Sequence, residues 1–253
     1  MRPILRRPGE GETTDDRAER TVRLLLDEPQ LAVSWSRYAP SERGPEPHVH
    51  REHVDAFYVL DGELIFAFGP EQVEAGAPAG TFVSVPQNVV HSFRSSDVET
   101  TFLNLHAPNA GFAGWLRDES APWDSHVVPA DGGRPAAEAR LWRDEERYEF
   151  DDRIRTVKAD LPEISSIELV VGDGWDGIAP HTHDAFLDSF YVLDGEVAFV
   201  VGDSEVRAGS GTYTAAPPGA RHGIRSVGVG ARLLNVHAPD GGFVERLRRG
   251  FSY

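Results

Sequence analysis

The chain contains 253 residues, 26% of them charged, and carries a formal net charge of −16. Because it contains no cysteine, disulfides, thiolate nucleophiles and thiolate metal ligands are excluded, and any metal must be held by imidazole and carboxylate groups. The negative charge argues against nucleic acid and anionic membranes as partners, since both would be repelled.

The N-terminal sequence MRPILRRPGEGE lacks the apolar stretch of a signal peptide. No later run approaches the ~20 apolar residues that span a bilayer, so we expect a cytoplasmic protein. Residues 21–27 and 31–39 then predict strands, and further short runs rich in Val, Ile, Leu, Phe and Tyr follow, broken by Gly, Pro, Asn and Asp. This succession predicts an all-β protein.

Turn and helix signals separate the predicted strands. Asp61-Gly62 and Asp194-Gly195 each lie between two apolar runs. Such dipeptides predict tight hairpins, because glycine tolerates the positive φ that the turn requires. Three segments are helix candidates: 111–119, 241–251 and around 135–147.

These elements belong to an internal repeat. Four histidines recur in the same order and at nearly the same offset: His48, His50, His91 and His106 return as His181, His183, His222 and His237. Asp55 returns as Asp188 inside near-identical text, AFYVLDGEL and SFYVLDGEV. A repeat of this length predicts one module written twice. We therefore expect an N-terminal domain over 1–128 and a C-terminal domain over 129–253.

The residue types copied most faithfully are metal ligands. His48 and His50 are two apart on a predicted strand, so both point to one face of the sheet. The candidate metal ligands are His48, His50, Asp55 and His91 in the first copy and His181, His183, Asp188 and His222 in the second. Three imidazoles and one carboxylate suit Fe(II), Mn(II), Ni(II), Cu(II) or Zn(II). Such a set leaves two positions open on a six-coordinate ion, whereas a tetrahedral zinc would be closed and structural.

The spacing of these residues resembles the two motifs of the cupin superfamily, G(X)5HXH(X)3,4E(X)6G and G(X)5PXG(X)2H(X)3N. The second motif is carried by Gly80, Pro86, Asn88 and His91, and again by Gly211, Pro217, Gly219 and His222. Asp55 and Asp188 stand where the family has glutamate, so a carboxylate remains on a shorter side chain. Gly44 is displaced from the usual glycine position, and Ser95 and Ser226 replace the final asparagine. Neither change removes a ligand.

By this resemblance the protein looks like a bicupin, with two tandem barrels of the double-stranded β-helix, or jelly-roll, type and a short helix after each. The resemblance implies one divalent transition metal per domain, with Fe, Mn or Ni favoured and Zn or Cu also compatible. It further implies a small-molecule substrate and, by similarity to quercetin dioxygenases, an oxidoreductase of dioxygenase type. Asp55 and Asp188 are then the candidate catalytic carboxylates. Two fused barrels can act as a monomer or form a homodimer.

Two other functions stay open. One is a non-catalytic, metal-dependent binding or sensing protein, and the other is an isomerase or decarboxylase of the sugar-phosphate or oxalate kind. A basic pocket would favour the isomerase, and only Arg94 and Arg225, three residues after the last ligand of each copy, hint at one. Asn104 and His106 share one face of a strand, where they and their counterpart His237 either adjoin the metal or serve packing.

Three residues of the first copy fall outside the repeated pattern. Glu52 and His53 have no counterparts, since Phe186 stands at the position of His53. We expect both residues on a solvated loop at the mouth of the barrel. His126 is expected to be a linker residue.

Overall fold

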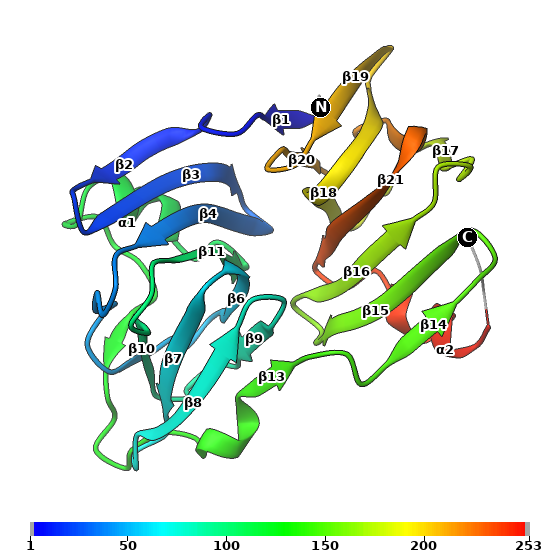
Figure 1. Cartoon of the computed structure of the whole chain (residues 1–253). Coiled ribbons are helices and arrows are strands. Elements are labelled where there is room, and N and C mark those ends of the chain that lie inside the picture. The colour runs from blue at the N-terminus through cyan, green and yellow to red at the C-terminus, as the bar shows by residue number, and fades with distance from the viewer. Residues whose placement is uncertain (1–2, 251–253) are drawn as a thin grey trace. The chain divides into compact units, whose positions relative to one another are not determined.

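The computed structural model describes residues 3–250 and consists mainly of strands (Figure 1). It divides into two compact units. The first unit comprises Gly11–Arg143, and the second comprises the described residues up to Glu10 together with those from Asp144 onward. This arrangement confirms the all-β jelly-roll class expected from the repeat. Among the described residues, no helix is long and apolar enough to cross a membrane.

The first unit contains two antiparallel sheets. Its strands are β2 (Glu12–Asp16), β3 (Arg20–Glu28), β4 (Leu31–Tyr38), β5 (His48–Val49), β6 (Val54–Asp61), β7 (Glu63–Phe68), β8 (Val73–Pro78), β9 (Phe82–Val85), β10 (His91–Ser95), β11 (Thr100–Ala107), β12 (His126–Val127) and β13 (Arg140–Trp142). One sheet has the order β13-β9-β6-β11-β4-β3-β2 and the other β12-β5-β10-β7-β8. The core draws apolar residues from both sheets, including Phe57, Phe66 and Phe102, because alternate strand residues face inward.

In the second unit, longer strands join the described elements into one antiparallel sheet. The strands are β1 (Ile4–Arg6), β14 (Arg147–Glu149), β15 (Arg153–Asp160), β16 (Ser165–Val171), β17 (Ile178–His181), β18 (Leu187–Val201), β19 (Ser204–Gly209), β20 (Tyr213–Ala216) and β21 (His222–Ala238). The described strands pair in the order β1-β20-β18-β21-β16-β15-β14, with β17 on β21 and β19 on β18. A separate core contains Phe190, Val192, Phe199 and Leu233.

The two Asp-Gly dipeptides do not close hairpins, and that prediction was wrong. β6 pairs with β9 and β11, whereas β7 pairs with β8 and β10. In the second unit, β18 runs through Gly195 with a register shift on each side of it. Gly62 and Gly195 both have a φ of 77°. At Gly62 the chain passes from one sheet to the other, and at Gly195 the strand bends but continues in the same sheet.

The predicted helices at 111–119 and 241–251 are confirmed as α1 (Phe112–Arg117) and α2 (Phe243–Arg248), although residue 251 lies outside the described part. The candidate helix at 135–147 was wrong. That segment contains only a 3-10 turn, Ala136–Glu138, followed by β13 and the start of β14.

The division between the units also differs from the expected boundary at 128. Residues 129–143 belong to the first unit, because β13 pairs with β9. The N-terminal arm belongs to the second unit, because β1 pairs with β20. Strand pairing between segments far apart in sequence therefore decides to which unit each end of the expected N-terminal domain belongs.

Candidate metal centres

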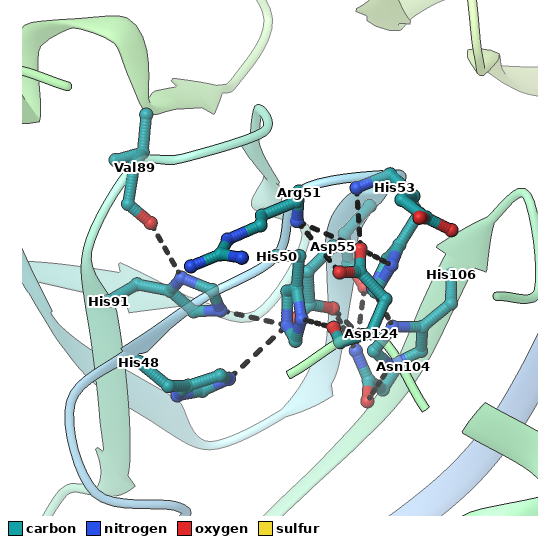
Figure 2. Close-up of polar contacts among 12 residues, drawn as sticks. His48, His50, Arg51, His53, Asp55, Val89, His91, Asn104, His106 and Asp124 are labelled. Carbon is teal, nitrogen blue, oxygen red and sulfur yellow. Dashed lines mark hydrogen bonds and ion pairs between the residues drawn. The ribbon is translucent and has the colours of Figure 1, made fainter. Parts of the chain in front are cut away.

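In the first unit, neighbouring strands bring the four candidate ligands together. β5 pairs with β10 so that His48 lies opposite His91. The carbonyl of His50 accepts a hydrogen bond of 2.6 Å from the backbone N–H of Asn88, which joins the two sequence motifs. One ligand atom from each of His48, His50, Asp55 and His91 lies within 4.8 Å of the others (Figure 2).

Backbone carbonyls orient the three imidazoles. Nδ1 of His48 donates to the carbonyl of Glu46 at 2.8 Å, and Nδ1 of His91 donates to the carbonyl of Val89 at 3.0 Å. Nδ1 of His50 donates to the carbonyl of Asp124. Each donation leaves Nε2 with a lone pair, which is the tautomer that a metal ligand needs. Nε2 of His91 and Nε2 of His50 lie 3.2 Å and 3.6 Å from the same oxygen of Asp55, and Nε2 of His48 lies 3.2 Å from Nε2 of His50.

The carboxylate of Asp55 is held from its other side. Asn104 donates from Nδ2 to Oδ1 of Asp55 at 2.6 Å, and Nε2 of His106 lies 3.6 Å from the same oxygen. β6 pairs with β11 so that His106 lies opposite Asp55. Burial by itself raises the pKa of Asp55, but the neighbouring imidazoles of His106, His50 and His91 together outweigh burial and hold that pKa well below its usual range. Asn104 and His106 thus contact the carboxylate of the cluster and do not serve only to pack the sheets together.

The second unit repeats the four-ligand cluster. One ligand atom from each of His181, His183, Asp188 and His222 lies within 4.8 Å of the others. β17 pairs with β21 so that His181 lies opposite His222, whose Nε2 is 3.2 Å from Asp188. Asn235 donates to Asp188 at 2.6 Å, as Asn104 does to Asp55.

The surroundings of the first cluster contain a hydrogen-bonded chain that the sequence did not indicate. His53 is fully buried, so its expected place on a solvated loop was wrong. Nδ1 of His53 donates to the carboxylate of Asp124 at 2.9 Å, and Nε2 of His53 lies 2.8 Å from Nδ1 of His106. His126 is not merely a linker residue, because it lies on β12 and contacts Asp124 at 2.8 Å. Glu52 is exposed, as expected.

The ring nitrogens of His50, His53 and His106 also gather within 4.8 Å. The 2.8 Å between His53 and His106 is a hydrogen-bond length, whereas two imidazole ligands on a tetrahedral ion lie about 3.3 Å apart. Nε2 of His50 is already directed at Asp55, 3.6 Å away. These three histidines therefore form a support for the first cluster and not a second ion site.

A cavity of about 730 Å³ adjoins the first cluster, and His48 and Asp55 form part of its wall. Phe112 and Trp115 from α1, together with Trp123, supply an aromatic wall. The rings of Trp115 and Trp123 stack with centroids 4.9 Å apart. The lining also includes the charged side chains of Arg17, Arg20 and Glu119. The first cluster therefore opens onto a space that suits a flat aromatic molecule with polar groups.

Arg94 and Arg225 lie at the surface and not in this cavity. Arg94 is 3.5 Å from Glu74, and Arg225 donates to Glu205 at 2.8 Å. Their guanidinium groups are therefore paired with carboxylates, and the basic pocket that would favour a sugar-phosphate isomerase is not built from them.

We expect the metal-free protein to lose stability between about pH 7 and about pH 5, in part because of His48. Burial, together with His91 and His50, lowers the pKa of His48 to about 3, against about 6.5 in an unfolded chain. The unfolded state then binds a proton that the folded state does not, which removes on the order of 2 kcal/mol from the free energy of unfolding. Denaturant titrations with a chelator measure this loss. His48→Gln should reduce it, and an unchanged loss would contradict the assignment.

Comparison with known proteins identifies a family to which the chain is similar and solved structures that share its fold. The cupin domain model matches residues 34–105 and 168–237. Quercetin 2,3-dioxygenase from Bacillus subtilis (strain 168) is 25% identical over 131 residues, which cover 51% of this chain and 38% of that enzyme. The chain thus matches well under half the length of this relative.

Two solved structures share the fold. A variant of Bacillus subtilis oxalate decarboxylase superposes with a TM-score of 0.68 at 14% identity, covering 94% of this chain and 77% of that one. The protein Ylba from E. coli superposes with a TM-score of 0.69 at 11% identity, covering 93% and 90%. At these identities the likeness shows the fold alone.

Proposed function

The chain belongs to the cupin domain family, and from this we propose that it is a metal-dependent oxidoreductase of dioxygenase type, acting on a small aromatic molecule. We propose one divalent transition metal per unit, iron, manganese or nickel before zinc or copper. The observation that carries the proposal is the aromatic-walled cavity of about 730 Å³ that contains His48 and Asp55 in its wall. The quercetin dioxygenase relative supports the same reaction type.

The donor set fits such an ion. Burial and neighbouring histidines keep His48 neutral at physiological pH, with a pKa of about 3, and a neutral imidazole is the form that binds metal. The ionised carboxylate of Asp55 adds one negative charge. When bound, a transition metal supplies Lewis-acid and redox chemistry at this position.

The residues around the cluster would bind, orient and deprotonate the substrate. Phe112, Trp115 and Trp123 would hold a planar ring and exclude water from it. Asp55 is the candidate proton acceptor, because it is the carboxylate of the cluster and it lines the cavity. Asn104 holds one of its oxygens at 2.6 Å, which leaves fewer orientations open to the carboxylate. In the second unit, Asp188 is the equivalent candidate.

Two measurements on one preparation test the proposal. Elemental analysis of untagged protein, purified without chelators, should find about two equivalents of iron, manganese or nickel per chain. Oxygen uptake should then rise with hydroxylated aromatic compounds and not with oxalate or sugar phosphates. Zinc alone, or turnover of oxalate without net oxygen uptake, would overturn the dioxygenase proposal in favour of a structural or decarboxylase role.

A further inference from the structure

Asp124 makes an unusual number of contacts beside the first cluster. It lies between α1 and β12, and its side chain is 4% exposed. Its carboxylate accepts hydrogen bonds from the backbone N–H groups of Arg51 at 2.9 Å and Glu52 at 2.6 Å. The same carboxylate contacts the imidazole of His53 at 2.9 Å (Figure 2). It also contacts the imidazole of His126 at 2.8 Å. A buried carboxylate with this many donors is held in a single orientation.

These contacts reach two of the four candidate ligands. The carbonyl of Asp124 accepts from Nδ1 of His50, which sets the tautomer and the ring plane of that ligand. Its carboxylate orders residues 51–53, the segment that joins His50 to the strand carrying Asp55. Through His53 it also supports His106, whose Nε2 lies 3.6 Å from Asp55.

The second unit lacks this support. Phe186 stands at the position of His53 and stacks on His183 with ring centroids 4.1 Å apart. Within residues 3–250, no group accepts a hydrogen bond from Nδ1 of His183. The side chain of His183 is 22% exposed, whereas that of His50 is 2% exposed. The two clusters therefore share their ligands and the asparagine that holds the carboxylate, but not the groups that orient His50.

We propose that Asp124 is a positioning residue that makes the first cluster the tighter of the two metal sites. Groups that hydrogen-bond to a histidine ligand fix its tautomer and raise its basicity, and losing one typically weakens metal binding by about 10- to 100-fold. A site whose ligands are already ordered also loses less conformational freedom on binding. The inference rests on the metal-binding part of the proposed function and is independent of the reaction.

The test measures the first site alone. His222→Ala removes a second-unit ligand, and in this parent variant Co(II) binding to metal-free protein is followed by calorimetry and by the visible absorption spectrum of the bound ion. Adding Asp124→Asn should weaken binding by about 10- to 100-fold and change the spectrum. Asp118→Asn is the matched control, because among residues 3–250 the side chain of Asp118 bonds to Ser120 alone. This change should alter neither the affinity nor the spectrum.

His53→Phe gives a second test, because it copies the second unit and leaves the backbone bonds of Asp124 intact. It should weaken Co(II) binding and shift the spectrum in the same direction, with circular dichroism checking that each variant is folded. Equal binding by the parent, Asp124→Asn and His53→Phe would overturn the inference while leaving the proposed function intact. A parent that binds no Co(II) would overturn both. If Co(II) binding by the variants changes as expected but the wild-type protein shows no oxygen uptake, the proposed reaction alone would be overturned.

Discussion

Replacing His91 with alanine is expected to remove one of two metal equivalents per chain and to reduce oxygen uptake by more than about 100-fold, beyond the usual effect of losing a supporting group. His91 lies opposite His48 in the pairing of β5 and β10, and its Nε2 is 3.2 Å from Asp55. Its removal leaves two imidazoles and a carboxylate. A set of this kind can bind Fe(II), but with one ligand fewer it binds more weakly, so we expect the ion to be lost during purification. Elemental analysis and oxygen uptake, measured on the same sample, report the two losses.

Two companion variants make this result interpretable. His222→Ala should remove the other equivalent while sparing the cavity of the first unit, which lies beside His48 and Asp55. Glu52→Ala changes an exposed side chain that is in neither ligand set and should keep both equivalents. Full metal content in both His91→Ala and His222→Ala would show that the ligand assignment is wrong.

Filling the cavity is expected to stop substrate binding without removing metal. Ser36 lies in the cavity wall, opposite Phe102 in the pairing of β4 and β11. A phenyl ring introduced by Ser36→Phe would occupy space meant for the substrate, and because the cavity is open there, overpacking of the core should be small. We expect kcat/KM to fall by more than about 10-fold, which corresponds to about 1.4 kcal/mol of transition-state stabilisation.

The control for this change lies on the other face of the same sheet. Thr101 is opposite Arg37 and does not line the cavity, so Thr101→Phe should leave kcat/KM and metal content near those of the wild type. Unchanged kinetics in Ser36→Phe would show that the substrate binds elsewhere. Loss of metal in Ser36→Phe would show that the change disturbs the cluster itself, and the kinetic comparison would then not support the cavity as the substrate site.

Much of the fold and the ligand sets could be predicted because both depend on local spacing. Period-2 runs broken by turn residues predict strands without any knowledge of their partners, and the repeat predicts two modules. His48 and His50 share a face of any strand that contains both. The family and the β-barrel class are confirmed, whereas metal binding by the eight ligands stays a prediction.

Strand pairing and burial were decided only in three dimensions. The Asp-Gly dipeptides predict a positive φ at Gly62 and Gly195, which the structure has, but whether such a residue closes a hairpin or bends a strand depends on which strands pair with its neighbours. The same is true of the boundary between the units, which follows from the pairing of β13 with β9 and β1 with β20.

Sequence alone thus determined that the chain is a duplicated all-β module with two sets of imidazole and carboxylate groups as candidate ligands, since residue type and spacing carry that information. Only the tertiary structure decided that the two sets are unequal. Asp124 is far along the chain from His50 and His53 and belongs to no motif. In the folded protein it nevertheless accepts hydrogen bonds from both histidines. A buried carboxylate is stable only with hydrogen-bond donors around it. Tertiary packing supplies those donors, so a local sequence pattern does not predict which residues they are.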